Sequence, residues 1–232
     1  MKKMAPIIAA IVAGSFGHSL PVAELSDQLA QGKKIIYAPW LSQIGGALTL
    51  GALAFCQHVW KALFAALEDL GDDFLCVLSV GKQPDALDFL WSNELEIFER
   101  VPSNVLIRGF VPQVEMLNNY TSVFISHVGF NSLQESLMAG VPLVAIPQAV
   151  DQPANARKVQ ERGWGRAFFK PMETVNSGTL AEALRQVSDA DGAYRQAVQS
   201  ARAELAGGAP RLAEQLVAMA KAGHGHAVLG GC

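Results

Sequence analysis

Residues 122–147 read SVFISHVGFNSLQESLMAGVPLVAIP, and this stretch contains two short apolar runs with a helical pattern between them. The runs SVFIS (122–126) and PLVAIP (142–147) have the length of buried strands. Residues 131–139 show the spacing of an amphipathic helix. Glycine, proline and asparagine bound these segments, as expected where a chain turns. The stretch therefore predicts a strand, a helix and a second strand.

The same alternation continues on both sides of this stretch. Two further apolar runs predict strands, FLCVLSV (74–80) and NVLIRGF (104–110). Amphipathic patterns predict helices at residues 83–97, 112–119 and 151–162. Strands and helices that alternate at this spacing form a parallel sheet covered on both faces, so the predicted fold class is α/β with a doubly wound sheet. Ligands of such sheets bind at the carboxyl ends of the strands.

The two ends of the chain are less regular. The further predicted elements are strands at PIIAAIVAG (6–14) and KKIIYA (33–38), a helix at SLPVAELSDQLA (19–30), and one long helix at ALTLGALAFCQHVWKALFAALEDL (47–70). Residues 174–222 are periodic and rich in alanine, which predicts helices throughout, with breaks near residues 189–192 and 207–210.

Composition restricts the class of protein and of partner. The chain has 232 residues, of which 50% are hydrophobic and 17% are charged, as in a folded protein with a large core. Its net charge of −3, without a cluster of lysine and arginine, predicts no nucleic-acid partner and no binding to an anionic membrane. Cys56, Cys76 and Cys232 are odd in number and lack CxxC spacing, which favours a reducing, cytoplasmic location.

The N-terminal segment MKKMAPIIAAIVAGS has two lysines and an apolar run, the features of a secretory signal. The run from Ile7 to Ala13 lies at the short limit for such a signal, so the cytoplasm remains the expected location. No apolar stretch approaches the ~20 residues that a helix needs to span a bilayer.

The turn SHVGFNSLQES admits two interpretations. In the first, the helix begins at Ser132, and its free backbone N–H groups point at the turn, where Gly129 lets a phosphate come close. His127 and Asn131 would add donors, and Glu135 is an acceptor of the kind that binds ribose hydroxyls. In the second, SLQE is a capping box, in which Ser132 and Glu135 each bond the other's backbone N–H group. The stretch alone leaves both open.

Two more polar clusters follow predicted strands. Asp151 and Gln152 come after PLVAIP, where they could start a helix or bind the hydroxyls of a sugar. Phe110, Pro112 and Gln113 end or follow NVLIRGF, where an aromatic plane beside an amide could stack on a nucleobase and bind it. Each cluster alone has a plain structural explanation, as a helix cap or a core aromatic. Polar strand ends that share one edge of the sheet favour a ligand site.

With the three clusters in this order, the run from Phe110 to Gly165 resembles the donor-binding signature of UDP-sugar-dependent glycosyltransferases with the two-domain GT-B fold. The matching segments are FVPQVEML and SHVGFNSLQESLMAGVPLVAIPQAVDQPANARKVQERGWG. The resemblance implies a Rossmann-like second domain, and Phe110 stands where the family usually has tryptophan. The implied site residues are Phe110 and Gln113 for the base, His127, Gly129, Asn131 and Ser132 for the diphosphate, Glu135 for the ribose, and Asp151 and Gln152 for the transferred sugar.

The segment GSFGHSLPVAELSDQLA is similar to the opening of that family's first domain, where His18 corresponds to the general base. Little sequence precedes the long helix, so the first domain would be shortened. KKIIYAPWLSQIGG is then either the first domain's second strand or the second domain's own first strand, and IYAPWLSQ replaces the usual Gly-Ser or Gly-Thr turn. The expected domains are a remnant at 1–48, a nucleotide-sugar-binding domain at 49–222 and a flexible tail at 223–232.

The resemblance implies an enzyme that moves a hexose from a UDP-sugar, or a dTDP-sugar, to a hydroxyl of a small lipophilic acceptor. The implied mechanism is direct displacement with inversion, with no metal or other cofactor and with the UDP-sugar as co-substrate. One alternative is a nucleotide-sugar-binding module that is inactive alone and needs a partner chain for the acceptor domain. A weaker one is a remnant that merely folds. A shortened first domain would leave apolar surface uncovered, which favours self-association.

Overall fold

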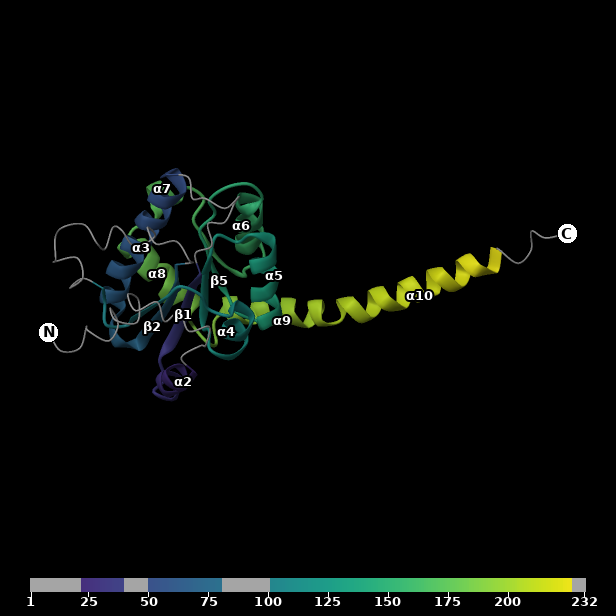
Figure 1. Cartoon of the computed structure of the whole chain (residues 1–232), viewed down its shortest axis with the longest axis horizontal. Coiled ribbons are helices and arrows are strands. Elements are labelled where there is room, and N and C mark those ends of the chain that lie inside the picture. The colour runs from purple at the N-terminus through teal and green to yellow at the C-terminus, as the bar shows by residue number, and fades with distance from the viewer. Residues whose placement is uncertain (1–21, 40–49, 81–100, 227–232) are drawn as a thin grey trace.

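Six parallel strands form one sheet in the computed structural model, which describes residues 22–39, 50–80 and 101–226 (Figure 1). The strands are β1 (Lys34–Pro39), β2 (Phe74–Ser79), β3 (Val105–Arg108), β4 (Val123–Ser126), β5 (Leu143–Ala145) and β6 (Gly165–Ala167). Their order across the sheet is β3-β2-β1-β4-β5-β6, and every adjacent pair is parallel. The sheet is therefore built outward from β1 in both directions, which confirms the doubly wound fold.

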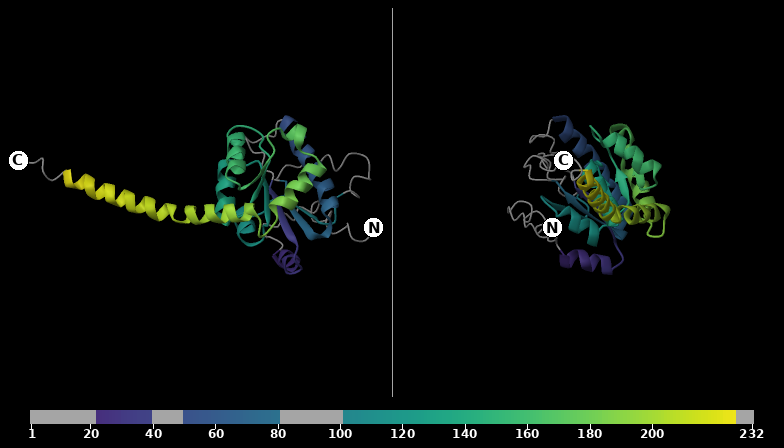
Figure 2. Two further views of the ribbon diagram at one scale, coloured as in Figure 1. Left: turned by 180° about the vertical axis from the view of Figure 1, so that it is seen from behind. Right: turned by 90° about the vertical axis from the view of Figure 1, so that its right-hand side faces the viewer.

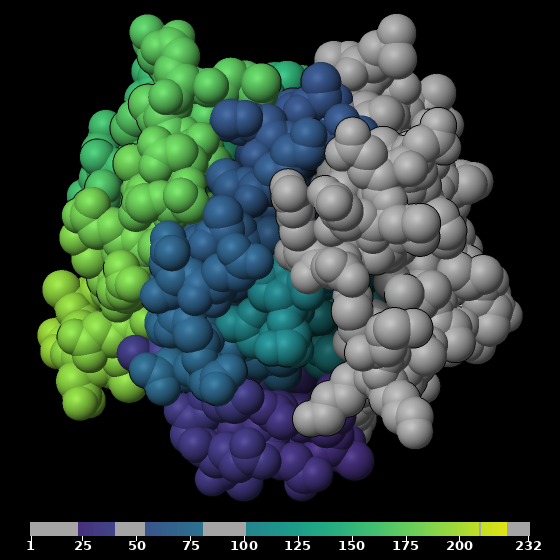
Figure 3. Space-filling model, turned by 90° about the vertical axis from the view of Figure 1, so that its left-hand side faces the viewer, coloured from purple at the N-terminus to yellow at the C-terminus, as the bar shows by residue number. Residues whose placement is uncertain are grey.

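Helices surround this sheet. They are α2 (Val22–Ala30), α3 (Leu50–Leu70), the short 3-10 helix η1 (Gly71–Asp73), α4 (Gln113–Asn119), α5 (Phe130–Ala139), α6 (Gln152–Glu161), α7 (Pro171–Thr174), α8 (Ser177–Val187), α9 (Ala193–Ala206) and α10 (Gly208–His226). α3 and α8 pack against each other over one face of the sheet, where Figure 3 shows them side by side. α2, α4, α5, α6 and α9 contribute to the core on the other face (Figure 2).

Side chains of the strands alternate between these two faces. On β1, Ile36 and Ala38 belong to one buried cluster, whereas Ile35 and Tyr37 belong to the other. Because successive residues of a strand point to opposite faces, a strand covered on both sides must be apolar throughout. This is why β2, FLCVLS, is buried at every position.

Most of the predicted elements are present, with slightly different ends. The four apolar runs between residues 74 and 147 form β2 to β5, and the last three helical patterns before residue 163 form α4, α5 and α6. The periodic segment near the C-terminus forms α8, α9 and α10. The strand predicted at 6–14 and the helix predicted at 83–97 lie outside the described residues. β6 is absent from the predictions, because GRA is three residues long and has no apolar run.

β1 occupies the centre of the sheet, between β2 and β4. In KKIIYAPWLSQIGG, the segment KIIYAP thus forms a strand of the same sheet as β2 to β6, whereas residues 40–46 lie outside the described residues. The sheet begins before residue 49, inside the segment expected to be a remnant of a first domain. At the other end, α10 projects from the body of the fold and runs to His226, so residues 223–226 of the expected tail are helical (Figures 1 and 2).

Candidate functional site

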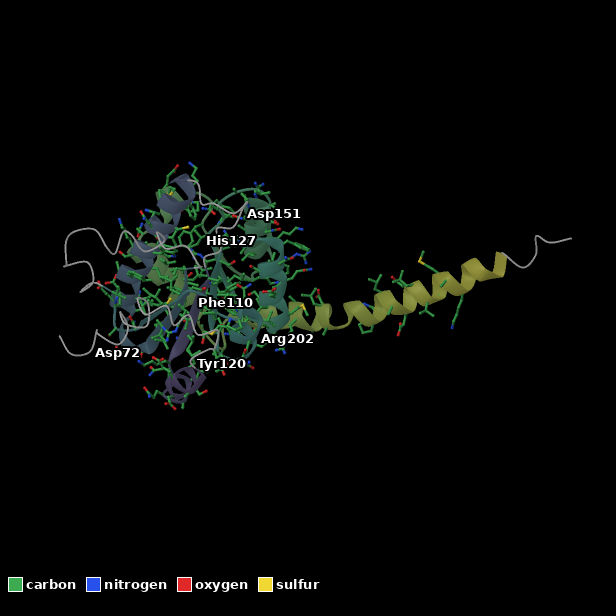
Figure 4. The ribbon with its side chains drawn as sticks, viewed as in Figure 1. Asp72, Phe110, Tyr120, His127, Asp151 and Arg202 are labelled. Carbon is green, nitrogen blue, oxygen red and sulfur yellow. The ribbon has the colours of Figure 1, made fainter. Side chains whose placement is uncertain are left out.

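Polar side chains follow the carboxyl ends of β3, β4 and β5, and these ends lie at one edge of the sheet. Figure 4 shows His127 and Asp151 toward this end of the molecule, whereas Asp72 and Tyr120, which precede strands, lie toward the opposite end. The order of connection reverses between β1 and β4, and doubly wound sheets bind ligands outside such a switch point. The fold therefore brings the predicted clusters to the expected edge.

The turn after β4 has a strained backbone. Val128 has a φ of 56°, in the left-handed region that β-branched residues rarely adopt. Both of its polar backbone groups are bonded by side chains: its N–H donates to Ser126 Oγ (3.0 Å), and its carbonyl accepts from Asn155 Nδ2 (3.0 Å). A strained residue costs on the order of 1–3 kcal/mol and persists only where its surroundings impose it. These bonds thus hold the turn that leads into α5.

α5 begins at Phe130, two residues earlier than predicted, and Gly129 is its N-cap residue. The predicted capping box is therefore wrong, because Ser132 already lies inside the first turn. Ser132 Oγ instead accepts a hydrogen bond from Gln113 Nε2 (3.3 Å). Within the described residues, the N-cap offers no side-chain bond to the first N–H groups of α5. A helix start of this kind is suited to an anion.

His127 lies against Gly129 and near Asp151. A Cβ atom at position 129 would lie 3.0 Å from His127 Nε2, so the glycine leaves room for the imidazole. Burial lowers the pKa of His127 below its ordinary value, and the smaller effect of the Asp151 carboxylate raises it. Burial therefore favours the neutral imidazole, in which one nitrogen donates and the other accepts.

Glu135 lies one turn into α5 and interacts with both α4 and β1. Its Oε2 accepts from Gln113 Nε2 at 2.6 Å, so the amide joins the two helices. Its charge also raises the pKa of Tyr37, although burial of that phenol is the larger cause. Tyr37 in turn stacks on Phe124, with ring centroids 5.6 Å apart and an interplanar angle of 15°. The carboxylate thus lies between a helix that binds it and the rigid centre of the sheet.

Asp151 and Gln152 begin α6 in different ways. Asp151 occupies the N-cap position, but its side chain makes no capping bond, and its Oδ2 accepts from Asn155 Nδ2 at 2.8 Å. The buried Gln152 uses its Oε1 to accept from the backbone N–H groups of Gln148 (2.7 Å) and Ala149 (3.0 Å). The exposed Asp151 can therefore meet a ligand, whereas Gln152 has only its Nε2 left to donate.

The other predicted site residues are exposed or lie outside the described ranges. Phe110 follows β3 with 48% of its surface exposed, and Asn131 is exposed on the first turn of α5. His18 belongs to residues 1–21, which the structure does not describe. No three His, Cys, Asp or Glu side chains gather as metal ligands within the described ranges. The helices of those ranges also include none with the length and apolar character that crossing a bilayer requires.

Three residues of this region were not predicted: Tyr37, Val128 and Asn155. Asn155 carried a detectable signal, because it follows Asp151 by four residues and so lies on the same face of a helix. Val128 carried none, since a valine in the left-handed region cannot be recognised from sequence. Tyr37 resembled any other core residue of a buried strand.

Comparison with known proteins places this edge in context. Residues 88–219, more than half of the chain, match the family described as "Erythromycin biosynthesis protein CIII-like, C-terminal domain". The chain is also 39% identical over 147 residues to the NDP-glycosyltransferase YjiC of Bacillus subtilis (strain 168), an alignment that covers 62% of this chain and 34% of that protein.

Two solved structures share the fold. The glycotransferase of kitacinnamycin is similar with a TM-score of 0.61 and 29% identity, over 80% of this chain and 44% of that one. Os79 from O. sativa, in complex with UDP and deoxynivalenol-3-glucoside, is similar with a TM-score of 0.61 and 23% identity, over 80% and 40% respectively. The chain thus spans less than half the length of each relative. The match over more than half of its own length shows that the chain belongs to the erythromycin biosynthesis protein CIII-like C-terminal domain family of glycosyltransferases.

Proposed function

We propose that the carboxyl edge of the sheet binds a UDP-sugar, or a dTDP-sugar, and that the chain is the donor-binding part of a glycosyltransferase. The arrangement at α5 carries this proposal. Ser132 and Glu135 do not cap the helix, and Gln113 instead holds the Glu135 carboxylate. An N-terminus without a side-chain cap suits a diphosphate, and a fixed carboxylate one turn further suits vicinal hydroxyls. The UDP bound by Os79 supports the choice of nucleotide.

In the proposed complex, each cluster takes one part of the donor. The exposed ring of Phe110 stacks on the base, as an aromatic plane does in other nucleotide sites. The neutral imidazole donates one hydrogen bond to a phosphate oxygen. The full assignment is Phe110 and Gln113 for the base, Glu135 for the ribose, His127, Gly129, Asn131 and Ser132 for the diphosphate, and Asp151 and Gln152 for the sugar.

The proposed reaction moves a hexose to a hydroxyl of a small lipophilic acceptor, with inversion. The acceptor oxygen bonds to the anomeric carbon while the bond from that carbon to the diphosphate oxygen breaks, and UDP leaves. His18 takes the acceptor proton as general base. The N-terminus of α5 and His127 stabilise the charge that develops on the diphosphate, and the proposal includes neither a metal nor another cofactor.

A second candidate is a nucleotide-sugar-binding module that is inactive alone. In this candidate, a partner chain supplies the acceptor domain; this chain spans 34% of YjiC and 44% of the glycotransferase of kitacinnamycin. We also propose a cytoplasmic location and self-association through exposed apolar surface. Light scattering tests the self-association, because a monomer at micromolar concentration would contradict it.

Calorimetric titration with UDP and with dTDP tests donor binding. No heat at millimolar concentration of either nucleotide would refute both candidates. Transfer from UDP-glucose to a panel of phenolic acceptors then separates them, with His18→Ala as the comparison. Turnover that falls in this variant supports the enzyme, and turnover that stays the same removes His18 as the base. A chain that binds UDP and transfers to no acceptor is the binding module.

A further inference from the structure

We infer that Asn155 is a positioning residue that joins the turn after β4 to the carboxylate of Asp151. The proposed assignment of donor-binding residues does not include this side chain. The inference rests on the proposed function only for its consequence, which is that Asn155 couples the diphosphate end of the donor site to the sugar end. The positioning role itself is inferred from the hydrogen bonds of Asn155 and does not depend on the identity of the ligand.

Asn155 has the position and the donors for this role. It lies in the first turn of α6 with 9% of its surface exposed. Its Nδ2 donates to the carbonyl of Val128 at 3.0 Å and to Oδ2 of Asp151 at 2.8 Å. An amide nitrogen carries two hydrogens, so both donors are used. The two acceptors belong to different loops, one after β4 and one after β5, so the side chain links these loops.

The bond to Val128 fixes the backbone next to His127. Val128 is fully buried and has a φ of 56°, so its carbonyl would need a partner in any conformation that the turn adopts. Asn155 supplies that partner, and Ser126 Oγ satisfies the N–H group of the same residue. Val128 lies between His127 and Gly129, which border the start of α5. Holding its strained peptide therefore fixes the backbone between His127 and Gly129.

The bond to Asp151 fixes an exposed carboxylate that would otherwise rotate. Asp151 heads α6 without making a capping bond, so Asn155 is the partner observed for its Oδ2. The carboxylate lies close enough to His127 to raise the pKa of the imidazole. Gln152 holds the backbone of the preceding loop from the same turn of α6. Gln152 of α6 thus holds the loop after β5, and Asn155 of the same helix links this loop to the turn after β4.

A plain core asparagine would give the same stability loss on substitution, so stability alone does not test the inference. Asn104 is the matched control. It is 7% exposed, and its Nδ2 also donates to two carbonyls, of Leu67 (3.2 Å) and Gly71 (3.0 Å). It precedes β3 and so lies at the amino end of the sheet, away from the site. Asn104→Ala should destabilise the chain without changing the coupling of His127 to Asp151.

The first test needs no ligand. The pKa of His127 is measured by NMR in the full chain, assigned with His127→Gln, for four variants that combine Asp151→Asn with Asn155→Ala. We expect Asp151→Asn to lower the pKa of His127 when Asn155 is present and to change it by less than half as much when Asn155 is alanine. An equal change in both backgrounds, or no change in either, overturns the inference. The same pair of measurements in the Asn104→Ala background should match the wild type.

The second test measures the consequence for the donor. Affinities for UDP and UDP-glucose are compared by calorimetry, and their ratio reports the contribution of the sugar. Asn155→Ala should lower the ratio of UDP-glucose affinity to UDP affinity by about tenfold, the effect of losing one charge-assisted hydrogen bond. In a chain that already carries Asp151→Ala, the same substitution should leave this ratio unchanged. A ratio equal to the wild-type ratio in Asn155→Ala refutes the coupling. A chain that binds no UDP refutes the proposed function instead, and the NMR test still decides the role of Asn155.

Discussion

Substitution of Glu135 by alanine separates the two roles that its position in α5 first suggested. In a capping box, Glu135 would stabilise the helix start alone, and its loss would cost about 1 kcal/mol whatever residue stood at position 113. In the structure, its Oε2 accepts from Gln113 Nε2 at 2.6 Å, a charge-assisted bond that joins α4 to α5. The two roles therefore differ in whether the effects of substituting Gln113 and Glu135 on the free energy of unfolding are coupled.

The magnitude follows from the type of bond. A hydrogen bond to a charged group contributes about 1.5–3 kcal/mol to the free energy of unfolding, and because Glu135 is only half-buried we take the lower end, about 1.5 kcal/mol. Gln113→Ala breaks the same bond. The double variant should therefore be more stable than the sum of the two single losses predicts, by about 1–1.5 kcal/mol.

Urea unfolding of the wild type, the two single variants and the double variant measures this coupling. Glu115 provides a control, because it is an exposed carboxylate in the first turn of the same α4 helix. Coupling of Gln113 to Glu135 that is no larger than its coupling to Glu115 would refute the contact. Titration of the same chains with UDP tests the proposed ligand role. Glu135→Ala should lower the affinity for UDP by at least tenfold, and an unchanged affinity would show that Glu135 does not bind the ribose.

Three further predictions concern the framework and the pH response. Gly165→Ala should destabilise the chain by about 3 kcal/mol or more in thermal unfolding, because the new Cβ atom would overlap the carbonyl oxygen of Leu143, whereas Gly178→Ala, with room for a Cβ atom, should not. Arg195→Ala should cost about 3 kcal/mol in urea unfolding, because the guanidinium donates to two backbone carbonyls at 2.8 Å each; lysine there should restore part of this. Burial lowers the pKa of His127, so the imidazole binds a proton more readily in the unfolded chain than in the folded one. The free energy of unfolding is therefore highest above about pH 6.5, the ordinary pKa of histidine, and falls as the pH drops toward the folded-state pKa. His127→Gln should flatten this decline between pH 7 and pH 5.

The fold could be predicted from sequence because each central strand had to be apolar on both faces. FLCVL in β2 and IIYAP in β1 are continuous runs without charge for that reason, and the helices between strands show a one-sided pattern. β6 follows another rule. Its GRA sequence pairs with β5 because Gly165 permits a backbone approach that any Cβ atom would block, and a single glycine carries no strand signal.

Sequence patterns predicted that polar residues follow β3, β4 and β5 at one edge of the sheet, but not the hydrogen bonds that these residues make there. SLQE has the composition of a capping box, but the left-handed turn at Val128 makes Gly129 the N-cap, and the helix starts before Ser132. The partners that replace the cap are distant in sequence: Gln113 lies 19 residues from Ser132, and Asn155 lies 27 residues from Val128. Local sequence patterns describe neighbours within about one helical turn, so such partners emerge only from the packing of α4 and α6 against α5.

Amide side chains hold the two carboxylates of this edge. Gln113 donates to Glu135, and Asn155 donates to Asp151. An amide donor fixes a carboxylate without neutralising its charge, and the amide itself does not titrate. A carboxylate bound in this way keeps lone pairs for the hydroxyls of a ligand, whereas one paired with arginine would have them occupied by the guanidinium. In the proposed complex, both carboxylates therefore keep lone pairs for hydroxyl groups of the donor, and the N-terminus of α5, which has no side-chain cap, would offset the negative charge of the diphosphate.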